Sequence, residues 1–276
     1  MVGSKISGEK CHFLHQDDPF LRLGPHKMEI LNKDPFRIIL QDFLSKDEID
    51  YLVRYATPRL FTERSKTGSN MRDVKKSDTS KKVRLVHSGK TTLFSHEGNT
   101  WLLKKTDEMD SVYPLLVRIS RKIEVATSLN VLGQYSSTPY QTTNYGLGGL
   151  CETHIDPHGY IEGVKLTPER QGLMRTGDMT ATFMAWLNDI DAGGYTAFDY
   201  VNYELRLQPR RGSAGFWFDL DKKGHRELRS SHMGCPVLSG SKWILNKWIY
   251  YFDQFKNYPC GLNSHEPMEA FTKYYI

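Results

Sequence analysis

The second half of the chain carries residue types that bind transition metals. His154 and Asp156 stand two residues apart, and His232 follows far downstream. Two imidazoles and one carboxylate on one face of a metal leave its other coordination positions open, an arrangement typical of non-heme Fe(II) oxygenases. These residue types therefore predict an iron site that keeps positions free for a cosubstrate and dioxygen.

The spacing of His154 and Asp156 is that of two residues on one face of a β-strand. Side chains two apart in a strand point the same way, whereas a helix would separate them. The preceding residues also favour a strand, because the turn-forming run 146–149 leads into residues 150–153. We expect His232 to arrive from a distant strand of a barrel.

Lys242 suggests what binds beside the metal. It lies where the turn Ser239–Ser241 opens the apolar strand Trp243–Leu245, so its ammonium group can start inside the barrel. A buried lysine needs an anionic partner. Metal ligands and lysine together suit an iron-bound oxoacid. A zinc hydrolase using the same three ligands is the alternative, since zinc also accepts them.

Six segments of the chain occur in the order found in one enzyme family. They are 144–149, 154–156, 181–183, 191–198, 209–214 and 232–243. From about Asp34 to Cys260 the chain resembles the catalytic domain of the prolyl 4-hydroxylases, most closely the collagen-type α subunits of animals. The resemblance implies an α+β fold: a double-stranded β-helix, or jelly-roll and cupin-like barrel, buttressed by N-terminal helices.

The resemblance also assigns roles in the site. It implies three iron ligands, His154, Asp156 and His232. It implies three contacts to 2-oxoglutarate, with Lys242 pairing with the far carboxylate and Tyr145 and Thr196 helping to hold the molecule. Iron and 2-oxoglutarate would then carry out oxidative decarboxylation to succinate and hydroxylate an unactivated C–H bond. Ascorbate is implied as the reductant that restores oxidised iron.

The substrate groove is the place where the chain departs from the family. Trp248 falls where the family has an aromatic residue near the bound peptide. The family commonly reads G-x-R-x-A-T, but here Gly177–Thr182 places Met179 at the arginine position. Methionine lacks the planar donor fork of arginine, although it can line an apolar groove. The insert 159–176 differs from the collagen enzymes as well.

The rest of the chain is expected to support this site. The capping box Ser45–Glu48 predicts a helix, and a second helix is predicted over 111–128, with apolar residues on one side at Val112, Leu115, Leu116, Ile119, Ile123 and Ala126. Strand-like runs follow at 180–187, 214–218 and 243–250. The expected organisation is an N-terminal extension (1–33), one domain (34–260, with helical support 45–128 and barrel 135–255) and a C-terminal tail (261–276).

Composition limits the choice of partners. The chain has 37 basic and 32 acidic residues, a net charge of +5 and no evident basic recognition helix, so we expect no nucleic-acid partner. The polar, lysine-rich stretch 62–99 is read either as a flap over a bound peptide or as a solvated loop. His158 is expected to be a loop residue, because a fourth protein ligand would occupy a position needed by cosubstrate or dioxygen.

Cysteines and the first residues bear on the cellular compartment. The resemblance pairs Cys235 with Cys260 in a disulfide, while Cys11 and Cys151 are expected to be free thiols. Disulfides persist in oxidising compartments, and the collagen-type enzymes work in the endoplasmic reticulum lumen. Residues 1–10 lack the apolar run of a secretory signal and no stretch is long enough to span a bilayer. The cytosol is therefore the alternative.

Function is expected to follow the family. The leading hypothesis is hydroxylation of peptidyl proline in collagen-like or other proline-rich chains, whose polyproline II form presents rings at regular intervals. One alternative is a catalytically silent peptide-binding barrel, because folds outlast activities. Another is a dioxygenase that acts on a different protein side chain. The resemblance makes protein disulfide isomerase a candidate partner, with a homo-oligomer as the alternative.

Overall fold

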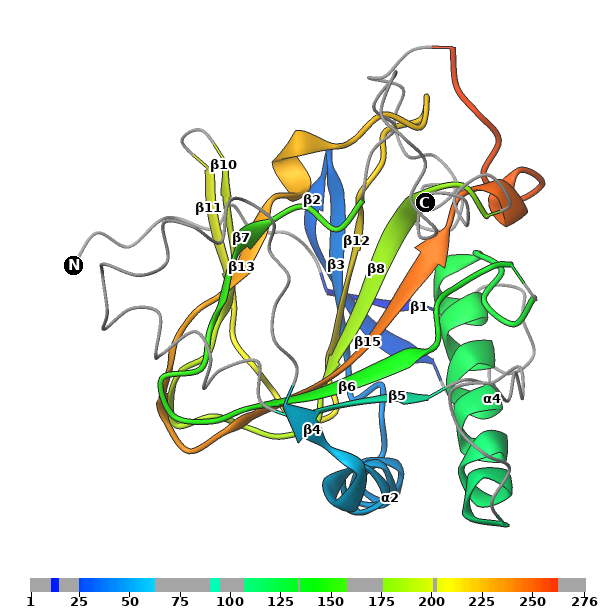
Figure 1. Cartoon of the computed structure of the whole chain (residues 1–276). Coiled ribbons are helices and arrows are strands. Elements are labelled where there is room, and N and C mark those ends of the chain that lie inside the picture. Colours follow the sequence, from blue (N-terminus) through cyan, green and yellow to red (C-terminus); the bar gives the residue numbers. More distant parts are fainter. Residues whose placement is uncertain are drawn as a thin grey trace, which may run out of the picture.

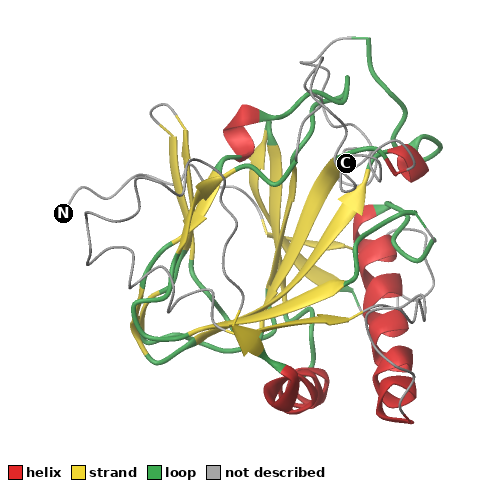
Figure 2. Cartoon of the chain, in the orientation of Figure 1, coloured by secondary structure: helices red, strands yellow, loops and turns green. Residues whose placement is uncertain are grey.

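The computed structural model describes residues 11–14, 25–62, 90–94, 107–133, 135–157, 176–200 and 203–262, and the structural statements below concern these ranges. Two facing sheets dominate the molecule (Figures 1 and 2). The large sheet has nine antiparallel strands, which are in spatial order β1 (Cys11–Leu14), β2 (His26–Lys33), β3 (Phe36–Gln41), β12 (Ala214–Phe218), β8 (Met179–Trp186), β15 (Lys242–Tyr250), β6 (Tyr140–Tyr145), β5 (Lys90–Phe94) and β4 (Phe61–Thr62).

The smaller sheet carries the strands that hold the metal-binding residues. Its order is β11 (Tyr203–Leu207), β10 (Thr196–Tyr200), β13 (His232–Gly234) and β7 (Cys151–His154). A separate pair joins β9 (Ala192–Gly193) to β14 (Val237–Ser239). The helical elements are α2 (Lys46–Ala56), α4 (Asp107–Thr127) and the short 3₁₀ turns η1 (Thr57–Arg59), η3 (Leu228–Ser230) and η4 (Phe252–Gln254).

Both faces of strand β8 are buried from Thr180 to Trp186. Met184 and Trp186 belong to a cluster that also takes side chains from β10, β11, β12 and β15, so the inner faces of the two sheets meet there. Phe183 and Ala185 point the other way, into a larger core shared with the helices. Figure 1 shows α4 on the side of the large sheet that faces away from the small sheet.

The first predicted helix is confirmed together with its capping box. The Glu48 backbone N–H donates to Ser45 Oγ at 3.2 Å, and the Ser45 N–H donates to Glu48 Oε2 at 2.9 Å. Helix α4 is longer than expected, beginning at Asp107 rather than Ser111. Its first turn, 107–110, is rich in acidic residues, which favour a helix N-terminus. All six apolar residues predicted to face inward along α4 are buried.

Two segments contribute more to the sheet than the sequence suggested. The expected N-terminal extension contains β2, whose Met28 and Ile30 are buried in the main core. The stretch 62–99 contains β5, which pairs with β6, so this part is a strand rather than a loop. The remainder of 62–99, His158, the insert 159–175 and the tail from residue 263 lie outside the described residues.

None of the helices in the described ranges is long and apolar enough to cross a bilayer.

Candidate active site

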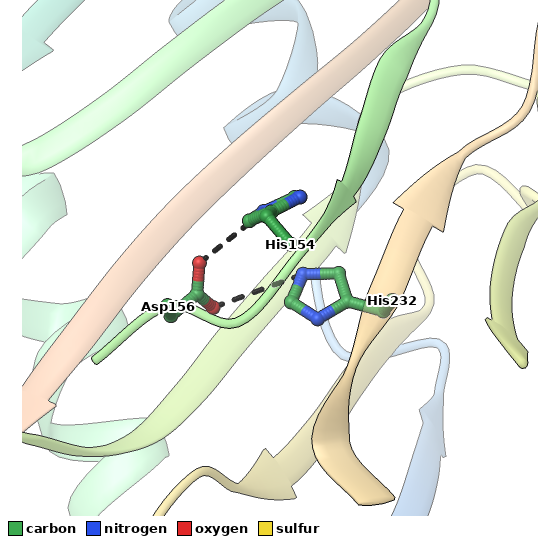
Figure 3. A group of neighbouring side chains, drawn as sticks. All are labelled: His154, Asp156 and His232. Atoms are coloured by element: carbon green, nitrogen blue, oxygen red, sulfur yellow. Dashed lines mark ion pairs between the residues drawn. The ribbon is translucent and has the colours of Figure 1, made fainter. Parts of the chain in front are cut away.

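His154, Asp156 and His232 converge on one point at the small sheet (Figure 3). One ligand atom from each of the three side chains lies within 4.8 Å of the others. His154 is the last residue of β7 and pairs with His232, the first residue of β13. Asp156 lies just beyond the end of β7, so the two-residue spacing acts across a strand end rather than within a strand. The distant histidine does arrive on its own strand.

Backbone carbonyls orient both imidazole rings. His154 Nδ1 lies 2.7 Å from the Glu152 carbonyl oxygen, and His232 Nδ1 lies 2.9 Å from that of Ser230. With Nδ1–H donating, each ring turns Nε2 towards Asp156, at 3.4 Å from Oδ1 for His154 and 3.8 Å from Oδ2 for His232. Ligating histidines usually have their second nitrogen fixed in this way. The donor set therefore fits a divalent cation with two imidazoles and one carboxylate.

Aromatic side chains fix the position of His232. Its ring centroid lies 5.0 Å from that of Trp217 and 5.5 Å from that of Phe198, and the His154 ring lies 4.4 Å away. The Asp156 and His232 side chains are only 7% and 8% exposed, whereas His154 is 32% exposed. The site is therefore walled on the Trp217 side and open on the His154 side.

The charges at the site suit a cation. Burial disfavours the imidazolium form of His154, but the hydrogen bonds and charges of Asp156 and Cys151 together outweigh this and raise its pKa to about 10. Burial also acts against ionisation of Asp156, yet the two histidines hold the pKa of its carboxyl below the usual range. Burial lowers the pKa of His232. An ionised carboxylate beside two imidazoles attracts a cation, and a metal dication would replace the proton that His154 holds.

Lys242 places an ammonium group near the triad. Its side chain is buried, and its Nζ donates to Thr196 Oγ1 at 3.2 Å. Tyr145 lies opposite Lys242 on β6, with its ring centroid 5.9 Å from Nζ. Burial lowers the pKa of Lys242 to about 8, and the nearby thiols of Cys235 and Cys151 oppose this change. Among the described residues, no carboxylate forms an ion pair with Lys242, so its ammonium group can pair with an external anion.

The strand register sets the distance between this lysine and the metal-binding residues. On β10 and β13, Thr196 pairs with Gly234 while Phe198 pairs with His232. Two residues of a strand span roughly 7 Å. Lys242 is hydrogen-bonded to Thr196. Its distance from the triad therefore matches the length of a five-carbon dicarboxylate.

The two residues expected in the substrate groove lie on neighbouring strands. Trp248 is half-buried on β15 and pairs with Thr182 of β8, whose hydroxyl contacts Asp156. Met179, also half-buried, begins β8 and pairs with Tyr250 next to a register shift. Both residues therefore lie along one edge of the site, with Trp248 nearer to the triad.

Sequence reasoning missed two residues that the structure places behind the triad. Thr182 Oγ1 lies 2.6 Å from Asp156 Oδ2 and 2.6 Å from Asp219 Oδ2. Asp219 is completely buried at the end of the apolar strand β12. A carboxylate that follows five buried apolar positions was the one signal in the sequence, since buried acids are rare.

The disulfide expected between Cys235 and Cys260 is not formed, because both cysteines are free thiols. Cys235 lies close to Lys242, the first residue of β15. Cys260 Sγ lies 2.8 Å from the hydroxyl of Tyr251, the residue that follows the last residue of β15. Nine strand residues separate these positions by roughly 26 Å. A disulfide requires Cα atoms within about 7 Å. Cys151 is free, as expected, and the side chain of Cys11 is outside the described set.

Peptide mapping under non-reducing conditions tests this arrangement. We expect iodoacetamide to alkylate Cys235 and Cys260 separately in protein purified without reductant, with Cys260 reacting first because it is exposed and Cys235 is half-buried. A peptide linked through both residues would contradict the free-thiol arrangement.

Comparison with known proteins agrees with this geometry. Residues 140–250 match the family model of the 2OG-Fe(II) oxygenase superfamily. Over 253 residues the chain is 32% identical to prolyl 4-hydroxylase subunit alpha-2 of Caenorhabditis elegans, covering 91% of this chain and 40% of the relative. It is 32% identical over 254 residues to the human subunit alpha-3, with the same coverage of both chains. The chain thus spans about 40% of the length of these relatives.

A solved structure shows the same fold at lower identity. The viral collagen prolyl hydroxylase of Paramecium bursaria Chlorella virus-1, solved as a 2OG complex, superposes with a TM-score of 0.50 and 18% identity. The match covers 78% of this chain and 94% of the viral one. The metal triad, the buried lysine and these similarities lead to one conclusion: residues 140–250 form a domain of the 2OG-Fe(II) oxygenase superfamily, and the chain is similar to the prolyl 4-hydroxylase alpha subunits.

Proposed function

We propose that this chain is an Fe(II)- and 2-oxoglutarate-dependent dioxygenase that hydroxylates peptidyl proline to 4-hydroxyproline, on a double-stranded β-helix. The observation that carries the proposal is the buried, carboxylate-free ammonium of Lys242, held by Thr196 within a short span of His232. The hydrolytic chemistry of a zinc site does not require such a cation. An oxoacid that chelates the metal through one end needs a cation to bind the carboxylate at its other end.

Different residues of the site would bind the metal and the cosubstrate. His154, Asp156 and His232 would hold Fe(II), and Lys242, Thr196 and Tyr145 would hold the far end of 2-oxoglutarate. Bound iron and 2-oxoglutarate supply the oxidising chemistry, with release of succinate and CO₂.

The surroundings keep this chemistry in place. The Trp217 and Phe198 rings exclude water from the inner side of His232, while the more exposed side of His154 leaves an approach for the peptide. The protein would thus orient and shield the reacting groups.

The substrate class follows from the family and from the groove. The relatives support a collagen-like or other proline-rich chain, whose extended polyproline II form offers rings to an open edge. Trp248 lies beside Thr182 at that edge and can pack on such a ring. Met179 replaces the arginine common in the family, so we propose that this groove favours apolar residues next to the target proline. A dioxygenase acting on another protein side chain is the alternative that shares this machinery.

Partners and compartment are proposed from the same relationship. Ascorbate would return oxidised iron to the ferrous form. Protein disulfide isomerase or a second copy of the chain would be the protein partner. The endoplasmic reticulum lumen would be the compartment, with the cytosol as the alternative.

Coupled turnover with a model peptide tests the proposal. We expect purified protein with Fe(II), ascorbate and 2-oxoglutarate to release succinate faster when a (Pro-Pro-Gly) repeat peptide is added, and mass spectrometry to find one added oxygen on proline. Zn(II) in place of Fe(II) should give no product, because zinc has no redox chemistry. Succinate release without peptide oxidation would leave a dioxygenase with a different substrate. Absence of succinate release from iron-loaded protein would favour a silent binding module.

A further inference from the structure

Asp219 is a buried carboxyl group whose charge no cation balances. It lies one residue past the end of β12 and is completely buried. Its backbone is fixed on both sides, because its N–H donates to the Thr180 carbonyl at 2.8 Å and its carbonyl accepts from Glu227 N–H at 2.9 Å. Among the described residues, no lysine, arginine or histidine forms an ion pair with Asp219. A buried acid without a basic partner is costly in its ionised form.

The side chain of Asp219 reaches the iron site through one hydroxyl group. Thr182 Oγ1 stands between two carboxyl oxygens, at 2.6 Å from Asp156 Oδ2 and at 2.6 Å from Asp219 Oδ2. Distances this short are typical of O–H···O⁻ hydrogen bonds. A threonine hydroxyl carries a single proton, so it can donate to one of the two carboxyl groups only. The second contact therefore needs a proton on a carboxyl oxygen.

The surroundings decide which carboxyl group carries that proton. Asp156 faces His154 and His232, which stabilise its ionised form. Asp219 has no such neighbours, and burial together with the charge of Asp156 raises its pKa well above the usual value, against the opposing contributions of Thr182, Trp217 and Ser230. The hydrogen-bond chain consequently has a single direction, from Asp219 through Thr182 to Asp156.

We propose that Asp219, as a neutral carboxylic acid, and Thr182 act as positioning residues for the proposed iron site: Asp219 donates to Thr182, and Thr182 donates to Asp156 Oδ2. This leaves Oδ1, on the His154 side, to bind the metal through one oxygen. The inference rests on the proposed function, because it concerns how the same triad holds iron. It adds two residues to the site that touch neither metal nor substrate.

The proposed relay has a measurable consequence for metal affinity. Partners of a metal ligand typically contribute 10–100-fold in affinity or activity, because they hold the ligand in its binding orientation. Without the Thr182 hydrogen bond, Asp156 is free to rotate about its side-chain torsions or to bind through both oxygens, which would take up a position needed by 2-oxoglutarate or dioxygen.

Two pairs of variants test the relay, with Co(II) as the metal probe. Thr182→Val removes the hydroxyl and Thr182→Ser keeps it, while Asp219→Leu removes the donor and Asp219→Asn supplies a neutral N–H donor of the same shape. We expect Thr182→Val and Asp219→Leu to weaken Co(II) binding to the metal-free protein by about 10–100-fold. We expect Thr182→Ser and Asp219→Asn to bind Co(II) about as tightly as the unmodified protein.

Particular outcomes would overturn the relay. If Asp219→Asn loses as much affinity as Asp219→Leu, the position requires a charge rather than a donor. If Thr182→Val and Asp219→Leu both bind Co(II) normally, the chain of hydrogen bonds has no role in the site. Thermal unfolding of each metal-free variant shows whether it folds.

Should the leucine variant not fold, infrared spectroscopy of the isosteric Asp219→Asn protein still decides. We expect the difference spectrum against the unmodified protein at neutral pH to show loss of one protonated-carboxyl C=O stretch. No such loss would overturn the proposal.

The design also separates this inference from the proposed function. Co(II) binding that depends on His154 and on the relay, with no oxidation of any proline peptide, would leave the relay standing and reject the substrate. Peptide hydroxylation that is indifferent to Thr182→Val would retain the function and reject the relay.

Discussion

Alanine in place of His154 will remove metal binding and, with it, all 2-oxoglutarate turnover. His154 offers Nε2 to the shared point while its Nδ1 is held by the Glu152 carbonyl, so the variant deletes one of three protein ligands. We expect a loss of affinity for Fe(II) larger than the roughly 100-fold effect typical of groups that only support a ligand. The measurement is anaerobic Fe(II) titration of the metal-free protein, followed by succinate release.

A matched control distinguishes ligand loss from general damage. His225 is also a histidine, its side chain is 70% exposed, and it lies beside Asp221 away from the triad. His225→Ala should leave both Fe(II) affinity and turnover unchanged. Both variants should fold, since His154 sits at a strand end and is partly exposed. Normal iron binding by His154→Ala would show that the metal lies elsewhere.

Alanine in place of Lys242 will leave Fe(II) binding intact but greatly weaken binding of 2-oxoglutarate. The ammonium is buried and has no carboxylate partner in the described structure, so the far carboxylate of the cosubstrate would lose its counter-charge. Truncating one member of a buried charge pair costs about 2–5 kcal/mol, which corresponds to a rise in KM of about 30-fold or more. KM for 2-oxoglutarate should rise much more than kcat falls. An unchanged KM would exclude Lys242 as the anion-binding group.

The same lysine predicts how binding depends on pH. Burial lowers the pKa of Lys242 to about 8, so in the free protein it is charged below this pH and becomes neutral above it. Affinity for 2-oxoglutarate should therefore fall by about tenfold per pH unit above roughly pH 8, because only the charged form binds a dianion well.

Lys242→Arg provides the control for this dependence, since a guanidinium stays charged throughout the range. Direct 2-oxoglutarate binding at pH 7 to 9.5, with Zn(II) in place of iron, is the measurement. An equal decline in the arginine variant would assign the titration to another group.

Local features of the sequence predicted several elements well. The Ser45–Glu48 capping box specifies where α2 begins, because its two reciprocal hydrogen bonds involve residues three apart. Helical spacing of apolar residues identified the buried side of α4, although an acidic first turn extended this helix towards its N-terminus. Strand β12 lies where its apolar run placed it. These features depend on neighbours in the chain and can be read without the fold.

Long-range pairing was predicted less well. Strand β2 lies in a range that looked like an extension, and β5 lies in a polar stretch that looked like a loop. Strand β2 is held by its pairing with β3 and by the buried side chains of Met28 and Ile30, whereas β5 pairs with β6 within a mostly polar stretch. A polar segment can join a sheet when an unpaired strand edge lies beside it in the fold. The residue types of the segment do not show whether such an edge is present.

The sequence by itself determined the residue types of the site: two histidines, an aspartate and a lysine near strand ends. Only the tertiary structure decided how they are supported. Thr182 meets Asp219, 37 residues away, because β8 and β12 pair in one register, and it meets Asp156, 26 residues away, because the chain beyond β7 of the other sheet reaches the same place. The fold likewise separates Cys235 from Cys260 along the length of β15. Such contacts depend on strand register and burial, and neither is encoded in local spacing.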